Sequence, residues 1–235
     1  MSHRTVWAVV LVKPFARAKQ RLAEVLDAGE RAELARLMLE DVLTAIDGCR
    51  DRLAGVIVVT ADAHAADIAR RHQALALVEA APVGINAAIG QAVDHLVERP
   101  GAGIVVVPAD LPQLVPNDIE EMIDLIDGPR AVALVRASDG GTNLLACRPA
   151  GVIAPRFGPD SFNAHCVAAT REGMTPTVRF APHLGLDIDR AHDLLAFISR
   201  GSATATHEYL STLNIQARLR ESGDAILPAQ TEQRM

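Results

Sequence analysis

The stretch that most constrains the fold is Gly103 to Pro112, which reads GIVVVPADLP. Its aliphatic run, residues 104–107, can bury both faces of a central strand. The strand cannot continue through Pro108 and Pro112, so it ends close to Asp110. Open α/β sheets bind their ligands at the carboxyl ends of their strands. Asp110 therefore stands where we expect a ligand to be held.

Strand-like segments alternate with helix-like segments along most of the chain. This alternation predicts an α/β fold with three layers, in which a mostly parallel sheet carries helices on both faces. The predicted strands are 6–12, 55–60, 75–78, 104–107, 131–135, 143–147 and 184–189, and the predicted helices are 32–46, 63–71, 85–97, 116–126, 161–171 and 191–199.

The alternation weakens after Gly201. We therefore divide the chain into a main domain, residues 1–200, and a C-terminal helical extension with a tail, residues 201–235. Within the extension, the pattern of residues 208–220 is typical of an exposed helix.

Composition argues against nucleic-acid binding and against membrane insertion. The formal net charge is −6, so the chain has no basic footprint for nucleic acid. No apolar run is long enough to span a membrane, and no signal-peptide cleavage pattern follows the N-terminus. The three cysteines are far apart and outside any CxxC pattern, which favours buried thiols over a disulfide or zinc site. We expect a cytoplasmic protein, and a homodimer is the default expectation for its assembly.

The only two lysines of the chain, Lys13 and Lys19, lie in the loop after the first predicted strand. An ammonium on a flexible stem suits triphosphate oxygens, and the N-terminus of the next helix is expected to add N–H donors. Arg21 closes the same loop and is a further candidate for substrate binding. The alternative is a basic helix start that stays in water. The strand–loop–helix setting favours phosphate binding.

Two more aspartates, Asp187 and Asp189, lie in the segment LDID. If this segment is a strand, both carboxylates share one face and repel each other unless a cation lies between them. Hard oxygen ligands select magnesium or manganese. The alternative is a pair of helix-capping aspartates. The third carboxylate, Asp110 at another strand end, favours a metal site.

Two glycine-containing loops could bind an anion. The first contains Thr142 and Asn143, and the second contains Gly158 and Ser161. Glycine lets the backbone approach a ligand and the hydroxyls can donate hydrogen bonds, although each loop alone could be only a tight turn. Asn86, after a glycine turn, could contact a base edge or cap a helix, and the cap is the favoured interpretation.

Together these segments resemble a known family. VKPFARAKQRL, PADLP, GGTNLL, FGPDSF followed by His165, and LDID occur in the order found in the guanylyltransferases of deazaflavin coenzyme F(420) biosynthesis, over residues 5–198. The resemblance implies a compact fold similar to nucleotide-diphospho-sugar transferases. It also implies transfer of GMP from GTP to a small phosphorylated carboxylic acid, with release of pyrophosphate. Carried over by position, it implies metal binding by Asp110, Asp187 and Asp189, acceptor binding by Thr142, Gly158 and Ser161, and phosphate contacts by Lys13 and Lys19.

The resemblance leaves the acceptor open among three acids. The alanine- and arginine-rich composition indicates a bacterium with a GC-rich genome, which favours 3-phospho-D-glycerate or phosphoenolpyruvate over 2-phospho-L-lactate. This chain departs from the family at Arg190-Ala191-His192, where Thr-Pro is common, and beyond Gly201.

Two other functions could explain parts of this pattern. A nucleotidyltransferase for molybdopterin or a sugar phosphate usually carries a GGxSxRxGxxK-like loop, which is absent here. A non-catalytic nucleotide-binding protein is disfavoured by the intact aspartates and lysines.

Overall fold

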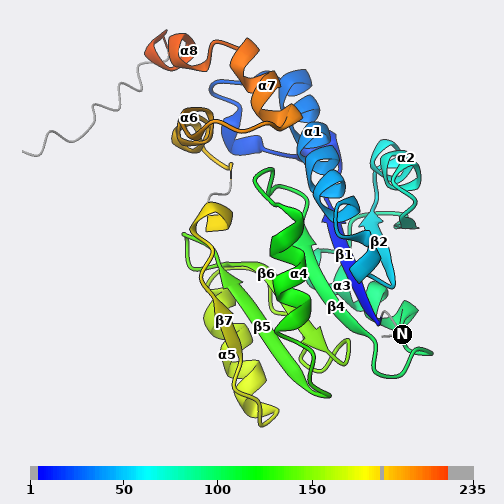
Figure 1. Ribbon diagram of the computed structural model, residues 1–235. Coiled ribbons are helices and arrows are strands. Elements are labelled where there is room, and N and C mark those ends of the chain that lie inside the picture. Colours follow the sequence, from blue (N-terminus) through cyan, green and yellow to red (C-terminus); the bar gives the residue numbers. More distant parts are fainter. Residues whose placement is uncertain (1–4, 186–187, 222–235) are drawn as a thin grey trace, which may run out of the picture.

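The computed structural model describes residues 5–185 and 188–221 of the 235-residue chain. A seven-stranded sheet runs through the molecule in the order β3-β2-β1-β4-β6-β5-β7 (Figure 1). The strands are β1 (Val6–Val12), β2 (Gly55–Thr60), β3 (Leu75–Val78), β4 (Gly103–Pro108), β5 (Ala131–Arg136), β6 (Thr142–Arg148) and β7 (Thr177–Arg179).

The sheet is mostly parallel, as predicted. Strand β6 is antiparallel to both of its neighbours, β4 and β5, whereas the other four pairings are parallel. The change of chain direction between β5 and β6 needs only a short loop, because antiparallel neighbours can be joined by a hairpin. The carboxyl ends of β1, β2 and β4 therefore meet at one edge, next to the hairpin loop of residues 137–141.

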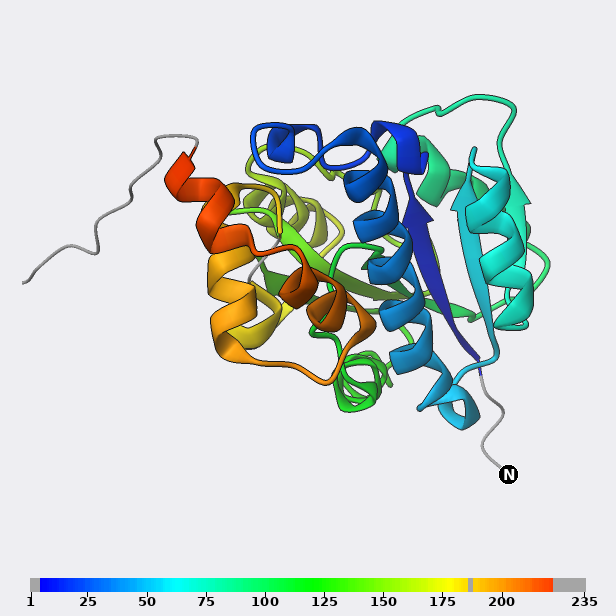
Figure 2. The same cartoon turned by 90° about the horizontal axis from the view of Figure 1, so that it is seen from above.

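Helices cover both faces of the sheet, which confirms the three-layer prediction (Figure 2). One face packs against α1, α2 and α4, and the other packs against α3 and α5. The helices are α1 (Ala28–Asp47), α2 (Ala63–Arg71), α3 (Ile85–His95), α4 (Pro116–Asp124), α5 (Ser161–Arg171), α6 (Ala191–Arg200), α7 (Ala205–Thr212) and α8 (Ile215–Glu221). Within the described residues, none of these helices has the length and apolar character needed to cross a membrane.

The three C-terminal helices form a cluster of their own with the start of the chain. We call it the C-terminal cluster; its buried members are Leu22, Val25, Leu26, Leu34, Met38, Ile188, Ala191, Leu194, Phe197, Leu210, Ile215 and Leu219. The prediction of one exposed helix over 208–220 is wrong. The segment forms two helices, separated at Asn214 by a left-handed backbone (φ 50°), and both helices contribute buried side chains to the cluster.

The predicted strand over 184–189 is also wrong. Pro182–Gly185 forms a 3-10 turn, Ile188 and Asp189 lie outside any strand, and residues 186–187 lie outside the described part of the chain. The last strand of the sheet is instead β7, which pairs with β5.

Several predicted boundaries coincide with the observed ones, namely those of β1, β2, β3, α2 and α5. Helix α1 begins earlier than predicted because Asp27 caps it. The Asp27 side chain accepts a hydrogen bond from the Glu30 backbone N–H (2.8 Å), and the Glu30 side chain accepts one from the Asp27 N–H (3.0 Å). This capping box satisfies N–H donors that would otherwise lack partners.

Candidate active site

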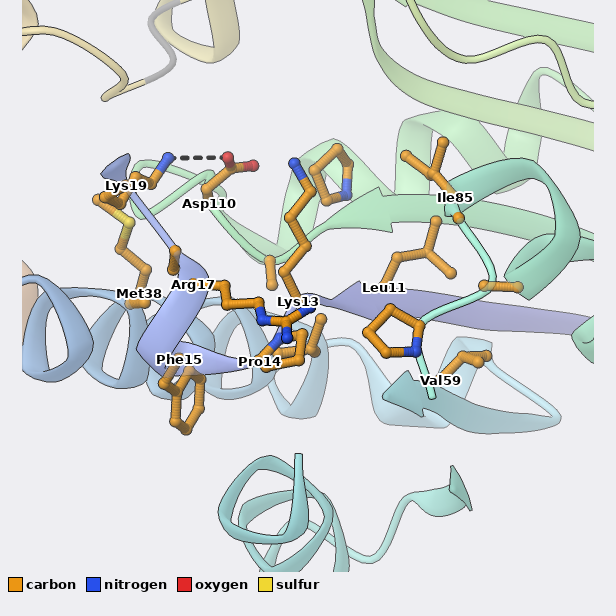
Figure 3. Close-up of a pocket in the computed structure, with 18 of the residues that line it drawn as sticks. Leu11, Lys13, Pro14, Phe15, Arg17, Lys19, Met38, Val59, Ile85 and Asp110 are labelled. Carbon is orange, nitrogen blue, oxygen red and sulfur yellow. Dashed lines mark hydrogen bonds and ion pairs between the residues drawn. The ribbon is translucent and has the colours of Figure 1, made fainter. Parts of the chain in front are cut away.

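A cavity of about 390 Å³ lies at the carboxyl edge of the parallel strands (Figure 3). Its walls come from the ends of β1 and β4, the loop after β1, and the start of α3. The charged side chains that line it are Lys13, Arg17, Lys19, Glu79, Asp110 and Asp189. Its size falls within the ordinary range for small-molecule sites. Both lysines predicted to bind phosphate thus lie in one cavity with two of the predicted metal aspartates.

The loop after β1 is held in place by two buried anchors. It contains two 3-10 turns, Phe15–Arg17 and Gln20–Leu22, in which Phe15 and Leu22 are buried. The Phe15 backbone N–H also donates a hydrogen bond to Asp62 (2.8 Å). The next α-helix, α1, begins at Ala28, and the Asp27 side chain already accepts a hydrogen bond from the N–H of Glu30 in its first turn.

Lys19 lies between the two carboxylates at the site. Its Nζ donates to Asp110 Oδ2 at 2.8 Å and to Asp189 Oδ1 at 3.1 Å, and only 6% of its side chain is exposed. Burial alone would lower the pKa of Lys19, but the charges of Asp110 and Asp189 outweigh it and raise that pKa. The backbone of Lys19 is left-handed (φ 50°), a conformation that non-glycine residues adopt uncommonly.

Asp110 is kept ionised by the same contacts. Burial would raise the pKa of its carboxyl group, but the charge and hydrogen bond of Lys19 and the charge of Lys13 lower it. Among the described residues Lys13 forms no direct ion pair with Asp110, so its charge lowers the Asp110 pKa from a longer distance. Arg21 makes a longer and more exposed contact with Asp189, at 3.4 Å between Nη1 and Oδ2.

Asp189 is positioned by the first turn of α6. The Asp193 side chain accepts hydrogen bonds from the backbone N–H groups of Asp189 (3.1 Å) and Arg190 (2.8 Å). Asp187, the third predicted metal ligand, lies outside the described residues. In the part of the chain that the structure describes, no three His, Cys, Asp or Glu side chains are grouped closely enough to hold a metal ion. Asp110 and Asp189 nevertheless already share one cation, the Lys19 ammonium.

A β-bulge turns Thr142 toward α5. The register between β5 and β6 shifts here, since Val135 faces Leu144 while Arg136 faces Thr142. Leu144 belongs to the core on the α1 side of the sheet, so strict alternation would send Thr142 to that side too. The extra residue, Asn143, shifts the alternation of side chains along β6, so the Thr142 side chain points to the other face of the sheet. Bulges beside functional sites often redirect a side chain in this way.

Thr142 reaches a buried histidine on α5. Its Oγ1 lies 2.9 Å from His165 Nδ1 and 3.4 Å from Ser161 Oγ. His165 Nε2 accepts a hydrogen bond from the Arg156 backbone N–H (2.9 Å). Burial, and secondarily the charge of Arg156, lowers the pKa of His165 to about 4. The imidazole is therefore neutral at physiological pH, and its ring also packs edge-on against Phe157.

Gly158 and Ser161 flank the start of α5. Gly158 has a left-handed backbone (φ 137°), and a side chain at this position would meet open space. The Ser161 N–H donates to the Gly158 carbonyl (3.2 Å). Gly158 thus contacts Ser161 through the backbone, and the Ser161 hydroxyl contacts Thr142.

Asn86 connects this loop to the cavity. Its side-chain oxygen accepts from the Phe157 N–H (2.8 Å) and its amide donates to the Phe157 carbonyl (3.0 Å). The interpretation of Asn86 as a helix cap is wrong, because Gly84 occupies that position. Gly84 and Ile85 line the cavity, so the Asn86 contacts link the cavity wall to the loop of Gly158.

The amide of Asn143 is likewise engaged with the backbone. It is buried and donates a hydrogen bond to the carbonyl of Leu184 in the 3-10 turn. In the described structure, the side-chain amides of both asparagines are therefore engaged with backbone groups.

The sequence alone does not identify two residues of the site, Arg17 and His165. Arg17 lines the cavity, and its place between the two lysines in one loop was the available signal. His165 was noted only as part of a motif. No sequence signal places it against Thr142, because that contact depends on the bulge in β6.

Known proteins resemble this chain in sequence over most of its length. It is 39% identical over 200 residues to the phosphoenolpyruvate guanylyltransferase of Roseiflexus castenholzii, covering 85% of this chain and 91% of that protein. It is 33% identical over 213 residues to the 3-phospho-D-glycerate guanylyltransferase of Phenylobacterium zucineum, with 90% and 98% covered. It is 31% identical over 220 residues to the 2-phospho-L-lactate guanylyltransferase of Methanothermobacter thermautotrophicus, with 93% and 96% covered.

Solved structures support the fold assignment. A Desulfovibrio desulfuricans protein, provisionally named a nucleotide-diphospho-sugar transferase, superposes with a TM-score of 0.73 at 18% identity, covering 93% of this chain and 98% of that one. The 4-diphosphocytidyl-2C-methyl-D-erythritol synthase of Anaerococcus prevotii gives a TM-score of 0.59 at 10% identity, with 88% and 96% covered. The predicted likeness to nucleotide-diphospho-sugar transferases is thereby confirmed at the level of fold.

A family model described as "Guanylyl transferase CofC like" matches residues 6–230. The match includes the loop with both lysines, the strand β4 and Asp110 two residues after it, and the C-terminal cluster. The chain therefore belongs to the CofC-like family of guanylyl transferases, which are nucleotidyltransferases.

Proposed function

We propose that this protein transfers GMP from GTP to the phosphate of a small phosphorylated carboxylic acid, with release of pyrophosphate, in coenzyme F(420) biosynthesis. One observation carries the proposal at the level of the site: Asp110 and Asp189 converge on a single cation inside a cavity that Lys13 and Arg17 also line. Such an arrangement suits a triphosphate, whose negative charge needs both fixed cations and a metal ion.

The cationic residues would act on the triphosphate and on the leaving group. An oxygen of the acceptor's phosphate is already ionised, so it can attack the α-phosphorus without a general base. The bond from the α-phosphorus to the bridging oxygen then breaks, and its electron pair leaves with pyrophosphate. Lys13 and Lys19 would stabilise this charge, each contributing roughly 3 to 4 kcal/mol to the transition state.

The donor set at the site fits magnesium, and also manganese. Both described carboxylates are hard oxygen donors, and their shared contact with the Lys19 ammonium supports the proposal that they bind a cation together. We propose that Asp110, Asp189 and Asp187 hold the ion, which when bound neutralises charge on the phosphates. Two or three carboxylates leave ligand positions for phosphate oxygens and water, which is typical of magnesium in nucleotide enzymes.

The acceptor would bind at Thr142, Gly158 and Ser161, with Arg21 near the phosphates. Asn86 and Asn143 would hold the walls of the site through their backbone contacts. We favour 3-phospho-D-glycerate or phosphoenolpyruvate as the acceptor and keep 2-phospho-L-lactate as the third candidate. The similarity of relatives named for all three acids does not separate them, because identities of 31% to 39% are compatible with a changed pocket.

The test is pyrophosphate release by the purified protein. GTP and magnesium are supplied with each of the three acids in turn, and ATP and CTP replace GTP as controls. We expect release with GTP and one or two of the acids, a much slower reaction with ATP or CTP, and no reaction after EDTA treatment. Equal rates with CTP, or no release with any of the three acids, would contradict the proposal.

A further inference from the structure

The donor and the acceptor of each hydrogen bond to the His165 ring can be assigned. The Arg156 backbone N–H can only donate, so His165 Nε2 must be the acceptor of this 2.9 Å bond and carries no proton. Since the ring is neutral, its single proton lies on Nδ1. The Nδ1–H group therefore donates to Thr142 Oγ1, at 2.9 Å, and His165 accepts nothing from Thr142.

One hydroxyl proton is then left over. Thr142 and Ser161 have one hydroxyl proton each, and their oxygens lie 3.4 Å apart, so one proton can be shared between them. Among the described residues, neither hydroxyl has another acceptor within hydrogen-bond distance. The remaining proton must therefore point away from the cluster, toward a ligand or water.

Both residues are almost completely buried, with 5% of Thr142 and 2% of Ser161 exposed. Burial makes an unsatisfied donor costly, so the cluster gains most from a ligand that offers only acceptor oxygens. A phosphate or carboxylate oxygen meets this requirement, and charge-assisted hydrogen bonds of this kind are stronger than neutral ones.

We propose that His165 is a positioning residue, whose Nδ1–H tautomer forces the Thr142–Ser161 pair to act as a hydrogen-bond donor toward an anionic oxygen of the acceptor. This inference rests on the proposed function, because it assigns the anion to the phospho-acid. Arg156 fixes the tautomer, and Phe157 packs against the ring and limits its rotation.

Two substitutions separate this role from a purely structural one. In His165→Asn, the side-chain amide can replace Nδ1–H as donor to Thr142, but it cannot reach the Arg156 N–H. In His165→Gln, the longer side chain can accept from Arg156 but cannot donate to Thr142. Both variants lose the imidazole ring, so each controls for the loss of packing in the other.

Steady-state kinetics with the acceptor that the wild type uses provide the first measurement. We expect the KM for the acceptor to rise about tenfold or more in His165→Gln and to stay within about threefold in His165→Asn. The KM for GTP is expected to be unchanged in both. Equal changes in the two variants, or an unchanged His165→Gln, would overturn the inference while leaving the guanylyltransferase activity of the wild type intact.

The second measurement needs neither variant nor activity. The ¹⁵N shifts of selectively labelled histidine in the wild-type protein report which ring nitrogen of His165 carries the proton. We expect the Nδ1–H tautomer at neutral pH. An Nε2–H tautomer or a doubly protonated ring would refute the positioning role even if no acceptor is turned over or a variant fails to fold.

Discussion

Replacing Lys19 with methionine tests whether Asp110 and Asp189 depend on a cation between them. The substitution removes the ammonium and keeps a side chain of similar length. At 2.8 and 3.1 Å, each ion pair has a gross attraction of about 5 to 6 kcal/mol for an effective dielectric constant of ~20.

Two effects offset most of the attraction between the Lys19 ammonium and the two carboxylates. Dehydrating the ammonium costs several kcal/mol, and the carboxylates, with 40% and 45% of their side chains exposed, are partly screened by water. A net loss of about 2 to 3 kcal/mol in the free energy of unfolding is therefore expected for Lys19→Met without magnesium.

Magnesium should restore part of this stability. An ion at ten times its dissociation constant stabilises the folded state by about 1.4 kcal/mol. In the wild type the magnesium ion must first displace Lys19 from the carboxylates. Magnesium should therefore raise the free energy of unfolding less in the wild type than in Lys19→Met.

Urea unfolding with and without magnesium measures both effects, and Lys13→Met is the matched control. Lys13 lies in the same loop and lines the same cavity, without a direct ion pair among the described residues. We expect it to change stability by less than about 0.5 kcal/mol. Equal destabilisation by both substitutions, or a larger gain from magnesium in the wild type than in Lys19→Met, would refute the reasoning.

Three further outcomes are expected. Asp110→Asn should reduce pyrophosphate release by at least about 100-fold, because it removes a carboxylate from the cation site, while circular dichroism should show an unchanged fold. Burial would lower the pKa of His72, but its hydrogen bonds to Asp47 (2.6 Å) and Glu40 (2.9 Å) outweigh this and raise it. The raised pKa stabilises the fold fully below the unfolded value of about 6.5, and this stabilisation is lost as pH rises through the folded pKa. The difference in unfolding free energy between wild type and His72→Gln should therefore be larger at pH 5.5 than at pH 8.5. Leu210→Ala should lower the unfolding free energy by about 2 to 4 kcal/mol, because Leu210 is completely buried in the C-terminal cluster; a change below 1 kcal/mol in urea titration would contradict that packing.

Sequence reasoning succeeded where burial and periodicity agree. The runs that form β1, β2 and β4 are apolar because both faces of a parallel strand are covered, and this pattern is visible without a structure. The position of Lys19 and Asp110 at one edge of the sheet follows from topology, since the carboxyl ends of neighbouring parallel strands meet there, but their direct ion pair was not predicted.

The errors lie where long-range packing decides local structure. Strand β7 has three residues, two of them exposed, so no apolar pattern marks it. In the segment 184–189, alternating apolar residues suggested a strand, but Ile188 is buried against the helices of the C-terminal cluster instead. The segment 208–220 appeared exposed because its apolar partners lie about 190 positions earlier, around Leu22 and Leu26.

The same long-range packing has a consequence for how the enzyme is made. Lys19 is synthesised 170 residues before its partner Asp189, and the helices that pack against its loop follow Asp189 in the chain. At a synthesis rate of roughly 5 to 20 residues per second, about ten seconds or more pass between the synthesis of Lys19 and that of Asp189, and the ammonium lacks its second carboxylate partner during this time. A chain growing on the ribosome can therefore complete all seven strands of the sheet before Lys19 has both of its carboxylate partners.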